Sequence, residues 1–170
     1  MSDLVGDTTH LHRTTVPFSA SHKIVGHEIH GSFLLSDATG FSSVASSRAS
    51  VKIVSDSLSC KIIGPAAADK AVSTAVAILP ETASNPTAFE HILSIGGFAY
   101  LEHSVYNSPG SVPVAFAAEA AHQIKPKPLV GSPPKVVYYH RVLGGDGKSV
   151  SHLVVQGLLE VDGVGFVKSW

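Results

Sequence analysis

Histidine is the side chain of this sequence best suited to change its charge near neutral pH. Ten histidines occur in 170 residues, and the formal net charge is −1 when all of them are neutral. An unperturbed imidazole has a pKa of about 6.5, so exposed histidines become positive as the pH falls toward about 5. Five of the ten lie in the first 30 residues, beside Arg13 and Lys23: His10, His12, His22, His27 and His30. This segment is therefore predicted to carry a pH-responsive positive charge.

The sequence His27-Glu28-Ile29-His30 is similar to a zinc-protease motif but is one residue too short. The HExxH motif places its two histidines four residues apart, on one face of a helix. In a strand, residues three apart point to opposite faces, which argues against a shared metal ion. His10 and His12 would share a face of an extended segment, but no carboxylate follows at the spacing of a cupin metal site. No metal site is predicted.

Other catalytic motifs are incomplete. The segment Gly144–Ser149 ends like a phosphate loop, but Val142 stands where that motif requires its first glycine. Its flanks look like strands, so a hairpin turn that uses glycines explains the segment better. No GxSxG sequence is present, and Cys60 lies in an apolar run, as a small core residue would. The sequence predicts no catalytic residue and favours a protein that is not an enzyme.

The composition indicates a surface that meets other protein. Charged residues make up only 15% of the chain, whereas an ordinary soluble domain has about 25%. Hydrophobic residues reach 44%, and the mean hydropathy is +0.25. The small net charge argues against an intrinsically disordered chain, and the pI of about 6.8 against a strongly basic nucleic-acid binder at neutral pH.

Cysteine usage and hydropathy bear on where the protein resides. The single cysteine, Cys60, excludes an internal disulfide and suits a reducing compartment. No apolar run approaches the ~18 residues of a membrane helix. Residues 1–6 carry an acid where a signal peptide carries bases. We expect a soluble protein that is intracellular where it is made, with no membrane partner.

Short apolar runs separated by turn residues predict an all-β fold. The predicted strands lie within 24–35, 51–64, 71–79, 97–102, 112–117, 136–143 and 150–161. The last run is long enough for two strands, or for one strand bent at Gly157. Seven or eight strands fit a β-sandwich or barrel. We expect one domain, residues 23–170, preceded by a partly ordered N-terminal arm, residues 1–22.

Two or three short helices are expected between the strands. Asn85 is a favourable N-cap with Pro86 at the first helical position, and Gly96 stands where that helix would end. The apolar stripe of this helix comprises Phe89, Ile92 and Leu93. Two other candidates are residues 117–123 and the weaker segment 40–48.

The segment Tyr138–Arg141 has two interpretations. Its two tyrosines, histidine and arginine could stack on and pair with single-stranded nucleic acid. Alternatively, its members alternate between the core and the opposite face of a strand. The alternating interpretation is the one we favour.

The order of elements from Val16 to Phe166 resembles that of the tymovirus coat proteins. Val16-Pro17-Phe18 precedes the first strand, where that family has a similar Pro-Phe. The apolar run 75–80 ends in proline and leads into Asn85-Pro86-Thr87, a helix and Gly96-Gly97, as it does in the family. Two later strands also match, 112–116 and 136–139. The sequence departs from the family at 46–50, where Arg48 alone remains of a Tyr-Arg-His, and at 78–82, which lacks an aromatic-rich run.

The resemblance implies an eight-stranded antiparallel jelly-roll β-sandwich with two or three short helices and an N-terminal arm. It implies a viral coat protein, not an enzyme, that self-assembles into an icosahedral shell of the T=3 class around single-stranded RNA. The protein would reside in the virion after synthesis in the host cytoplasm. The RNA would be weakly or non-specifically bound. No cofactor is expected, although polyamines or divalent cations can serve as counterions of the RNA.

Within this interpretation, two sets of residues are candidates for function. The residues proposed to contact RNA or respond to pH are His10, His12, Arg13, His22, Lys23, His27 and His30. The residues proposed to lie at subunit interfaces are Asn85, Phe89, Gly96, Gly97, Tyr138 and Tyr139. No residue is assigned to catalysis or to a metal.

Two alternatives belong to other functional classes. A cellular jelly-roll module that binds carbohydrate or another ligand should present a flat aromatic platform. Aromatic residues make up only 7% of this chain, and its single tryptophan is Trp170. A cupin-like metalloenzyme requires a His-Glu-His spacing that is missing here.

Overall fold

The computed structural model describes residues 12–38, 50–54, 56–65, 70–107, 110–116, 134–144 and 149–163. The predicted helices at 40–48 and 117–123 lie outside these residues, as does most of the segment 144–149.

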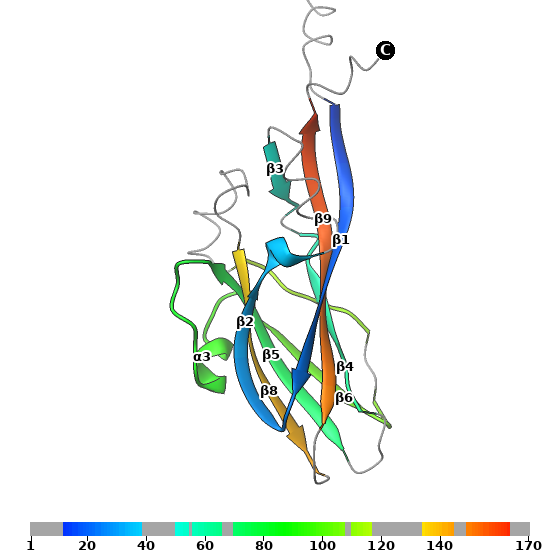
Figure 1. Ribbon diagram of the computed structural model, residues 1–170, viewed down its shortest axis with the longest axis vertical. Coiled ribbons are helices and arrows are strands. Elements are labelled where there is room, and N and C mark those ends of the chain that lie inside the picture. The colour runs from blue at the N-terminus through cyan, green and yellow to red at the C-terminus, as the bar shows by residue number, and fades with distance from the viewer. Residues whose placement is uncertain are drawn as a thin grey trace, which may run out of the picture.

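The strands form two antiparallel sheets that pack face to face (Figure 1). The five-stranded sheet has the order β1-β9-β4-β7, and β3 pairs with the edge of β9 that also carries β4. Its strands are β1 (His12–Val25), β3 (Ser50–Ile53), β4 (Ser59–Ile63), β7 (Val112–Pro113) and β9 (Val150–Gly163). The four-stranded sheet has the order β2-β8-β5-β6. Its strands are β2 (Glu28–Leu34), β5 (Ala71–Pro80), β6 (Ala99–Ser104) and β8 (Pro134–Leu143).

The chain passes from one sheet to the other at β1–β2, β4–β5, β6–β7 and β8–β9. Two four-stranded layers connected in this way form a jelly roll, with β3 as a short additional strand. The predicted all-β jelly roll is therefore confirmed. All four of these connections lie at one end of the sandwich, the lower end in Figure 1.

β9 is a single long strand and is the organising strand of its sheet. It pairs with β1 without a break, from His12↔Gly163 to Val25↔Val150. Along its other edge the partner changes from β4 to β3 on either side of Gly157. The upper part of this β1–β9 pair projects beyond the four-stranded sheet in Figure 1.

The core lies between the sheets and follows strand alternation. On β1, Phe18, Ala20 and Ile24 point inward, and their neighbours in sequence face outward. β5 differs, because all seven residues from Val72 to Ile78 are buried. The outer face of β5 is covered by the short helix α3 (Phe89–Leu93), whose Ile92 packs with Ala75, Ala77 and Val137.

The predicted arm of residues 1–22 is wrong for residues 12–22. These residues form most of β1, and Phe18 is only 3% exposed. Small and polar side chains such as Thr, Ser and His mask the alternating pattern in the sequence, but backbone pairing with β9 needs no particular side chain. Residues 1–11 lie outside the described residues.

The predicted helix start is also wrong. α3 begins at Phe89 after Ala88, which caps it without a side-chain hydrogen bond. The side-chain amide of Asn85 instead donates to Ser32 Oγ at 3.0 Å. Gly97, beyond the end of α3, has φ +82° and leads the chain into β6. Burial of Ile92, rather than an N-cap, holds this five-residue helix in place.

Several predicted strands differ in extent. The run 24–35 is divided by a turn at Gly26 between β1 and β2, and the run 51–64 is divided into β3 and β4. The run 112–117 contributes only the two residues of β7. The runs 71–79 and 136–143 are confirmed as β5 and β8.

Candidate functional site

An aromatic cluster lies on the outer face of the four-stranded sheet, at α3. The Arg141 guanidinium stacks over the Phe89 ring, 3.8 Å from its centroid. The rings of Tyr139 and Tyr100 meet Phe89 edge-on, with centroids at 5.9 and 6.0 Å. The ring of His30 stacks on Tyr139 at 6.1 Å. We call these five residues the aromatic cluster.

Carboxylates surround the aromatic cluster. The Tyr139 hydroxyl donates a hydrogen bond of 2.5 Å to Glu28 Oε1, which raises the pKa of Tyr139. Cross-strand register places Glu28, Arg141, Ser73 and Glu102 in one row across four strands. Glu90 is exposed on α3 beside this row. The face therefore carries one arginine among three acids.

The interior between the sheets contains two histidines. His22 Nε2 lies 3.0 Å from the Tyr138 hydroxyl, and its ring stacks on Phe33 at 4.7 Å. His140 Nδ1 lies 2.8 Å from Thr74 Oγ1, and both side chains are fully buried. Desolvation lowers the pKa of His22 and lowers that of His140 to about 4, so both imidazoles are neutral at pH 7.

Three buried polar atoms of this interior have no hydrogen-bond partner among the described residues. They are His140 Nε2, Ser149 Oγ and Ser151 Oγ. Such atoms in a sandwich are commonly satisfied by enclosed water. These unpaired atoms agree with a neutral His140, because a charged imidazole at this position would lack a counter-ion.

Exposed apolar side chains gather at the lower end of the sandwich. They belong to the ends of four strands and to the segment after β6: Val25, Ile63, Leu143, Val150, Val105 and Tyr106. Register places Val25 opposite Val150 and Ile63 opposite His152, so these positions are neighbours. Tyr106 is 86% exposed. We call this set the apolar end.

The outer face of the five-stranded sheet is uncovered and basic in its lower half. One cross-strand row consists of Lys23, His152 and Ile63, and the next consists of Ser21, Val154 and Lys61. All six side chains are exposed or half-buried. Higher on this face Lys52 lies opposite Glu160 on β9.

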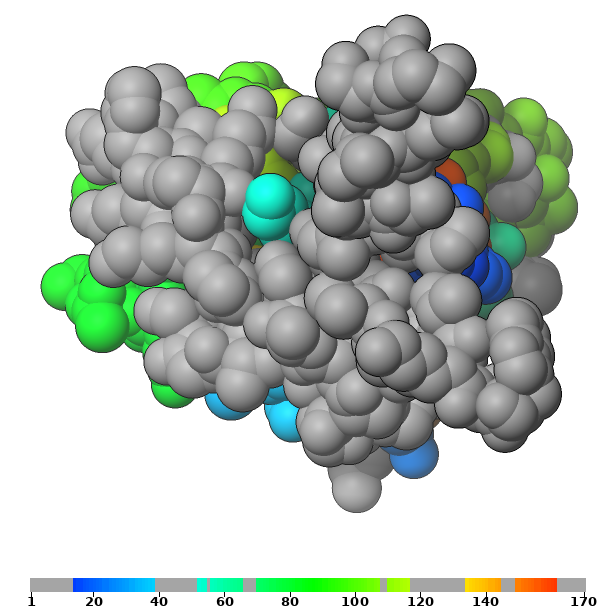
Figure 2. Space-filling view, turned by 90° about the horizontal axis from the view of Figure 1, so that it is seen from above, coloured from blue at the N-terminus to red at the C-terminus, as the bar shows by residue number. Residues whose placement is uncertain are grey.

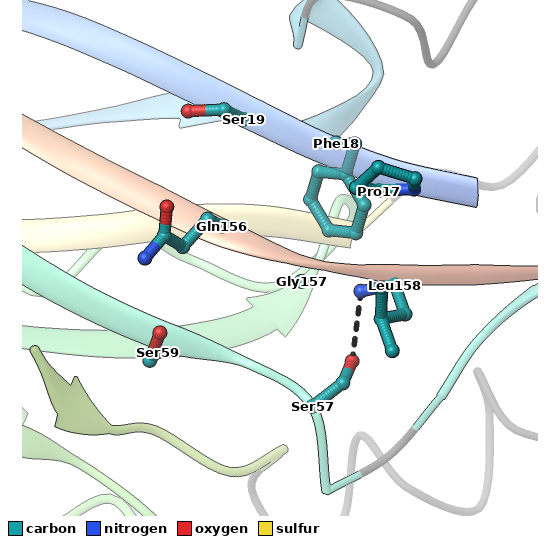
Figure 3. Close-up of a pocket in the computed structure, with 8 residues that line it drawn as sticks. All are labelled: Pro17, Phe18, Ser19, Ser57, Ser59, Gln156, Gly157 and Leu158. Atoms are coloured by element: carbon teal, nitrogen blue, oxygen red, sulfur yellow. Dashed lines mark hydrogen bonds between the residues drawn. The ribbon is translucent and has the colours of Figure 1, made fainter. Parts of the chain in front are cut away.

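A shallow hollow of about 510 Å³ marks the point where β9 changes partner (Figure 3). The Leu158 amide donates to Ser57 Oγ at 3.0 Å, which caps the gap between β3 and β4. A Cβ at Gly157 would lie 2.8 Å from Leu58 Cδ2 and 3.1 Å from the Phe18 ring. The hollow is lined by serines, Gln156 and apolar groups, and contains no ionisable side chain that could act as an acid or base.

The structure separates the residues predicted to contact RNA. His22 lies in the interior, Lys23 on the outer face of the five-stranded sheet and His30 in the aromatic cluster on the opposite side. His27 lies in the turn between β1 and β2, where its carbonyl accepts a hydrogen bond from the Val142 amide. His10 and the side chains of His12 and Arg13 lie outside the described part of the chain.

The structure divides the predicted interface residues as well. Phe89 and Tyr139 belong to the aromatic cluster, whereas Tyr138 is buried in the core. This division follows the alternation favoured for Tyr138–Arg141. Gly96 and Gly97 are exposed beyond α3, and Asn85 is exposed beside β2. The sequence did not predict that Tyr100 and Arg141 contact Phe89, because only the register of β6 and β8 brings these side chains together.

The described residues offer no cluster suited to a metal ion and no helix suited to a membrane. They contain no group of three histidine, cysteine, aspartate or glutamate side chains arranged to hold a metal ion. None of the described helices is long and apolar enough to cross a membrane.

Comparison with known proteins gives a match in structure only. No protein-family model matches the chain, and no curated protein sequence matches it significantly. A chain of Desmodium yellow mottle tymovirus matches with a TM-score of 0.66 and 15% identity, over 91% of this chain and 83% of the other. A chain of turnip yellow mosaic virus matches with a TM-score of 0.63 and 14% identity, over 95% and 100%. A chain of cocksfoot mottle virus matches with a TM-score of 0.54 and 11% identity, over 91% and 96%.

These neighbours are capsid proteins, which are structural proteins rather than enzymes. The matches extend over nearly the whole chain, and they agree with the strand order in indicating one architecture. With its two antiparallel sheets and this order of strands, the chain has the jelly-roll fold of the tymovirus capsid proteins.

Proposed function

We propose that this chain is a viral coat protein that self-assembles into a closed shell around an RNA genome. The observation that carries the proposal is the apolar end. Six exposed apolar side chains gather there on a chain in which only 15% of residues are charged. A contiguous apolar patch on a soluble domain marks a surface that other protein covers.

The partner we infer for the apolar end is another copy of the chain. Closed symmetric assemblies repeat one contact many times, so a single small subunit can enclose a large volume. The similarity to capsid proteins supports this choice of partner. The shell class, T=3, and residence in the virion after synthesis in the host cytoplasm are parts of the same proposal.

The RNA component of the proposal depends on charge. A net charge of −1 supplies no neutralisation of phosphates at pH 7, so polyamines or divalent cations would balance most of the RNA charge. The N-terminal histidines would add positive charge at lower pH. RNA contact would then be weak and independent of base sequence.

The test is assembly of the purified chain at neutral pH and moderate salt. Electron microscopy and sedimentation velocity should show uniform shells. The double variant Leu143→Asp/Tyr106→Asp should sediment as small species, because two carboxylates in the apolar end oppose its burial. Thr87→Asp, at an exposed site away from this end, is the matched control and should assemble as the parent chain does. A parent chain that stays monomeric at high concentration would overturn the proposal.

The second candidate, a carbohydrate- or ligand-binding module, depends on the aromatic cluster. Arg141 lies over the Phe89 ring, and the rings of Tyr139 and Tyr100 stand nearly perpendicular to it, so the cluster does not form a flat platform. Tyr100, at 40% exposed, is more open than Phe89 or Tyr139. A monomer that binds an oligosaccharide, with binding lost in Tyr100→Ala, would favour this alternative.

A further inference from the structure

The outer faces of the two sheets carry opposite charge. In the lower half of the five-stranded sheet, the charged side chains of the described residues are Lys23 and Lys61. Lys23 and Lys61 form no ion pair with another described residue. No carboxylate shares their two cross-strand rows.

The outer face of the four-stranded sheet is acidic. Glu28 and Glu102 lie at the two ends of the row through Arg141, and Glu90 projects from α3. The single arginine is engaged by the Phe89 ring at 3.8 Å. Glu90 and Glu102 are exposed and form no ion pair with another described residue. Arg141 keeps its positive charge in its contact with Phe89 and balances one of the three carboxylates, so the part of the face around α3 retains a net negative charge.

The two faces point away from each other. In the view along the long axis, green residues of the α3 region and blue residues of β1 lie on opposite sides of the molecule (Figure 2). One copy cannot bring its own faces together, but a second copy can offer its basic face to the acidic face of the first. Each face also has an apolar group to bury: Val154 on one and Tyr100 on the other.

We propose that the basic face of one copy, centred on Lys23 and Lys61, docks against the acidic face of the next copy, centred on Glu90 and Glu102. The proposal deepens the proposed function, because it names a lateral contact of the shell that is distinct from the apolar end. The contact is head-to-tail, and a head-to-tail contact generates a closed ring when the rotation between successive copies closes. Complementary charge fixes the partner and the register of such a contact.

Charge reversal tests the docking. Lys23→Glu/Lys61→Glu makes both faces acidic, and Glu90→Lys/Glu102→Lys makes both faces basic. Each double variant should raise the concentration needed for assembly by about tenfold or more at low salt, since like charges then oppose each other. The quadruple variant, which carries both reversals, should return this concentration to within about threefold of the parent value. Thermal unfolding verifies that each variant is folded.

The restoration is the decisive result. If the quadruple variant assembles no better than the double variants, or the double variants assemble like the parent chain, the docking is wrong. A third outcome assigns the basic face to RNA: Lys23→Glu/Lys61→Glu then forms shells normally but retains less RNA, measured by the ratio of absorbance at 260 and 280 nm. That outcome also overturns the docking.

A mixing experiment separates this inference from the proposed function. The two double variants are complementary to each other, so a mixture should associate even where each alone stays monomeric. Sedimentation velocity of the mixture at low salt detects that association without requiring shells. If the parent chain forms no shell but the mixture associates, the coat-protein proposal fails and the docking stands. If shells form but the mixture gives no association, the docking alone fails. Added salt should weaken the association, because exposed charges are screened.

Discussion

The two sheets of this sandwich belong to one fold but present different surfaces. In β9 of the five-stranded sheet, buried residues alternate with half-buried or exposed ones from Ser151 to Val161, except at the half-buried Gly157. In β5 of the four-stranded sheet, Val72–Ile78 is buried without interruption. The difference arises from cover, since α3 lies over the outer face of β5 and none of the described helices lies over β9.

Small side chains on the outer face of β5 allow α3 to pack against it. Ala75 and Ala77 on the outer face of β5 are small enough for Ile92 of α3 to pack against them. A strand that is buried on both faces loses the polar alternation of a half-exposed strand. The open face of the five-stranded sheet presents lysines, whereas the acids of the covered four-stranded sheet lie around α3.

The largest expected difference in stability is between two variants, each of which places a carboxylate on the outer face of one sheet. Ala77→Asp buries an unpaired charge beneath α3 and should lower the free energy of unfolding by about 4 kcal/mol or more. Val154→Asp, on the open face, should change it by no more than about 0.5 kcal/mol. Urea unfolding monitored by circular dichroism measures both. Similar losses in the two variants would contradict the difference in cover.

The second effect is a dependence of stability on pH. Burial lowers the pKa of His140 to about 4, while the unfolded chain has a pKa near 6.5. Between these values the unfolded state binds more protons, so the histidine's contribution is complete above pH 6.5 and is lost as pH falls toward 4. The loss should reach about 3 kcal/mol. Urea midpoints from pH 7.5 to 4 measure it.

The control for this pH effect is a variant of His91, a histidine on α3. His140→Gln should flatten the pH profile, leaving a smaller slope from His22, whose pKa burial also lowers. His91→Gln, at an exposed site of α3, should leave the slope unchanged. A profile that His140→Gln does not alter would show that another group controls it.

Two strands and the facing of two tyrosines could be predicted from the sequence, whereas the extent of β1 could not. The strands at 71–79 and 136–143 were predictable because β-branched and apolar residues dominate them. Alternation alone predicted that Tyr138 and Tyr139 face opposite sides. The extent of β1 was not predictable, since Thr, Ser and His interrupt its apolar residues while β9 supplies its backbone partners.

The candidate surfaces were less predictable than the strands. Lys23 and Lys61 are far apart in sequence, and only pairing of both β1 and β4 with β9 places them on one face. Arg141 meets Phe89 only through the packing of α3 on β8. Contacts of this kind depend on register between distant strands, which local composition does not encode.

Two glycines give an effect of intermediate size, one in the loop that leads into β6 and one within β9. Gly97 has φ +82°, and an added Cβ would lie 2.6 Å from the Ala115 carbonyl oxygen. Gly97→Ala should lower the free energy of unfolding by about 2 kcal/mol, because backbone cannot give way easily. Gly157→Ala should lower it by about 1 kcal/mol, since Leu58 can shift its side chain.

Gly110→Ala is the matched control for both glycine variants, because a Cβ there meets no atom within 4 Å. Its midpoint in urea should equal that of the parent chain. If Gly157→Ala proved more damaging than Gly97→Ala, the junction where β9 changes partner would be the more rigid of the two sites.

The smallest effect is expected where the five-stranded sheet is interrupted. Ser57 Oγ accepts from the Leu158 amide at 3.0 Å and donates to the Val54 carbonyl at 2.7 Å. Ser57→Ala should lower the free energy of unfolding by about 1 kcal/mol, because water replaces part of these bonds. Ser111→Ala loses only a 3.4 Å contact from Gln156 and serves as the control, with no measurable change expected.

Cys60 gives the molecule a built-in reporter of opening. Its thiol is fully buried on β4, and burial raises its pKa to about 12. The thiolate is the form that attacks alkylating reagents, so they should modify this side chain only when the two layers separate. Because it is the chain's one sulfhydryl, a dye maleimide would attach to any cysteine introduced on the surface and to no other position in the folded state. The rate of modification in the native chain would therefore time the transient exposure of its interior.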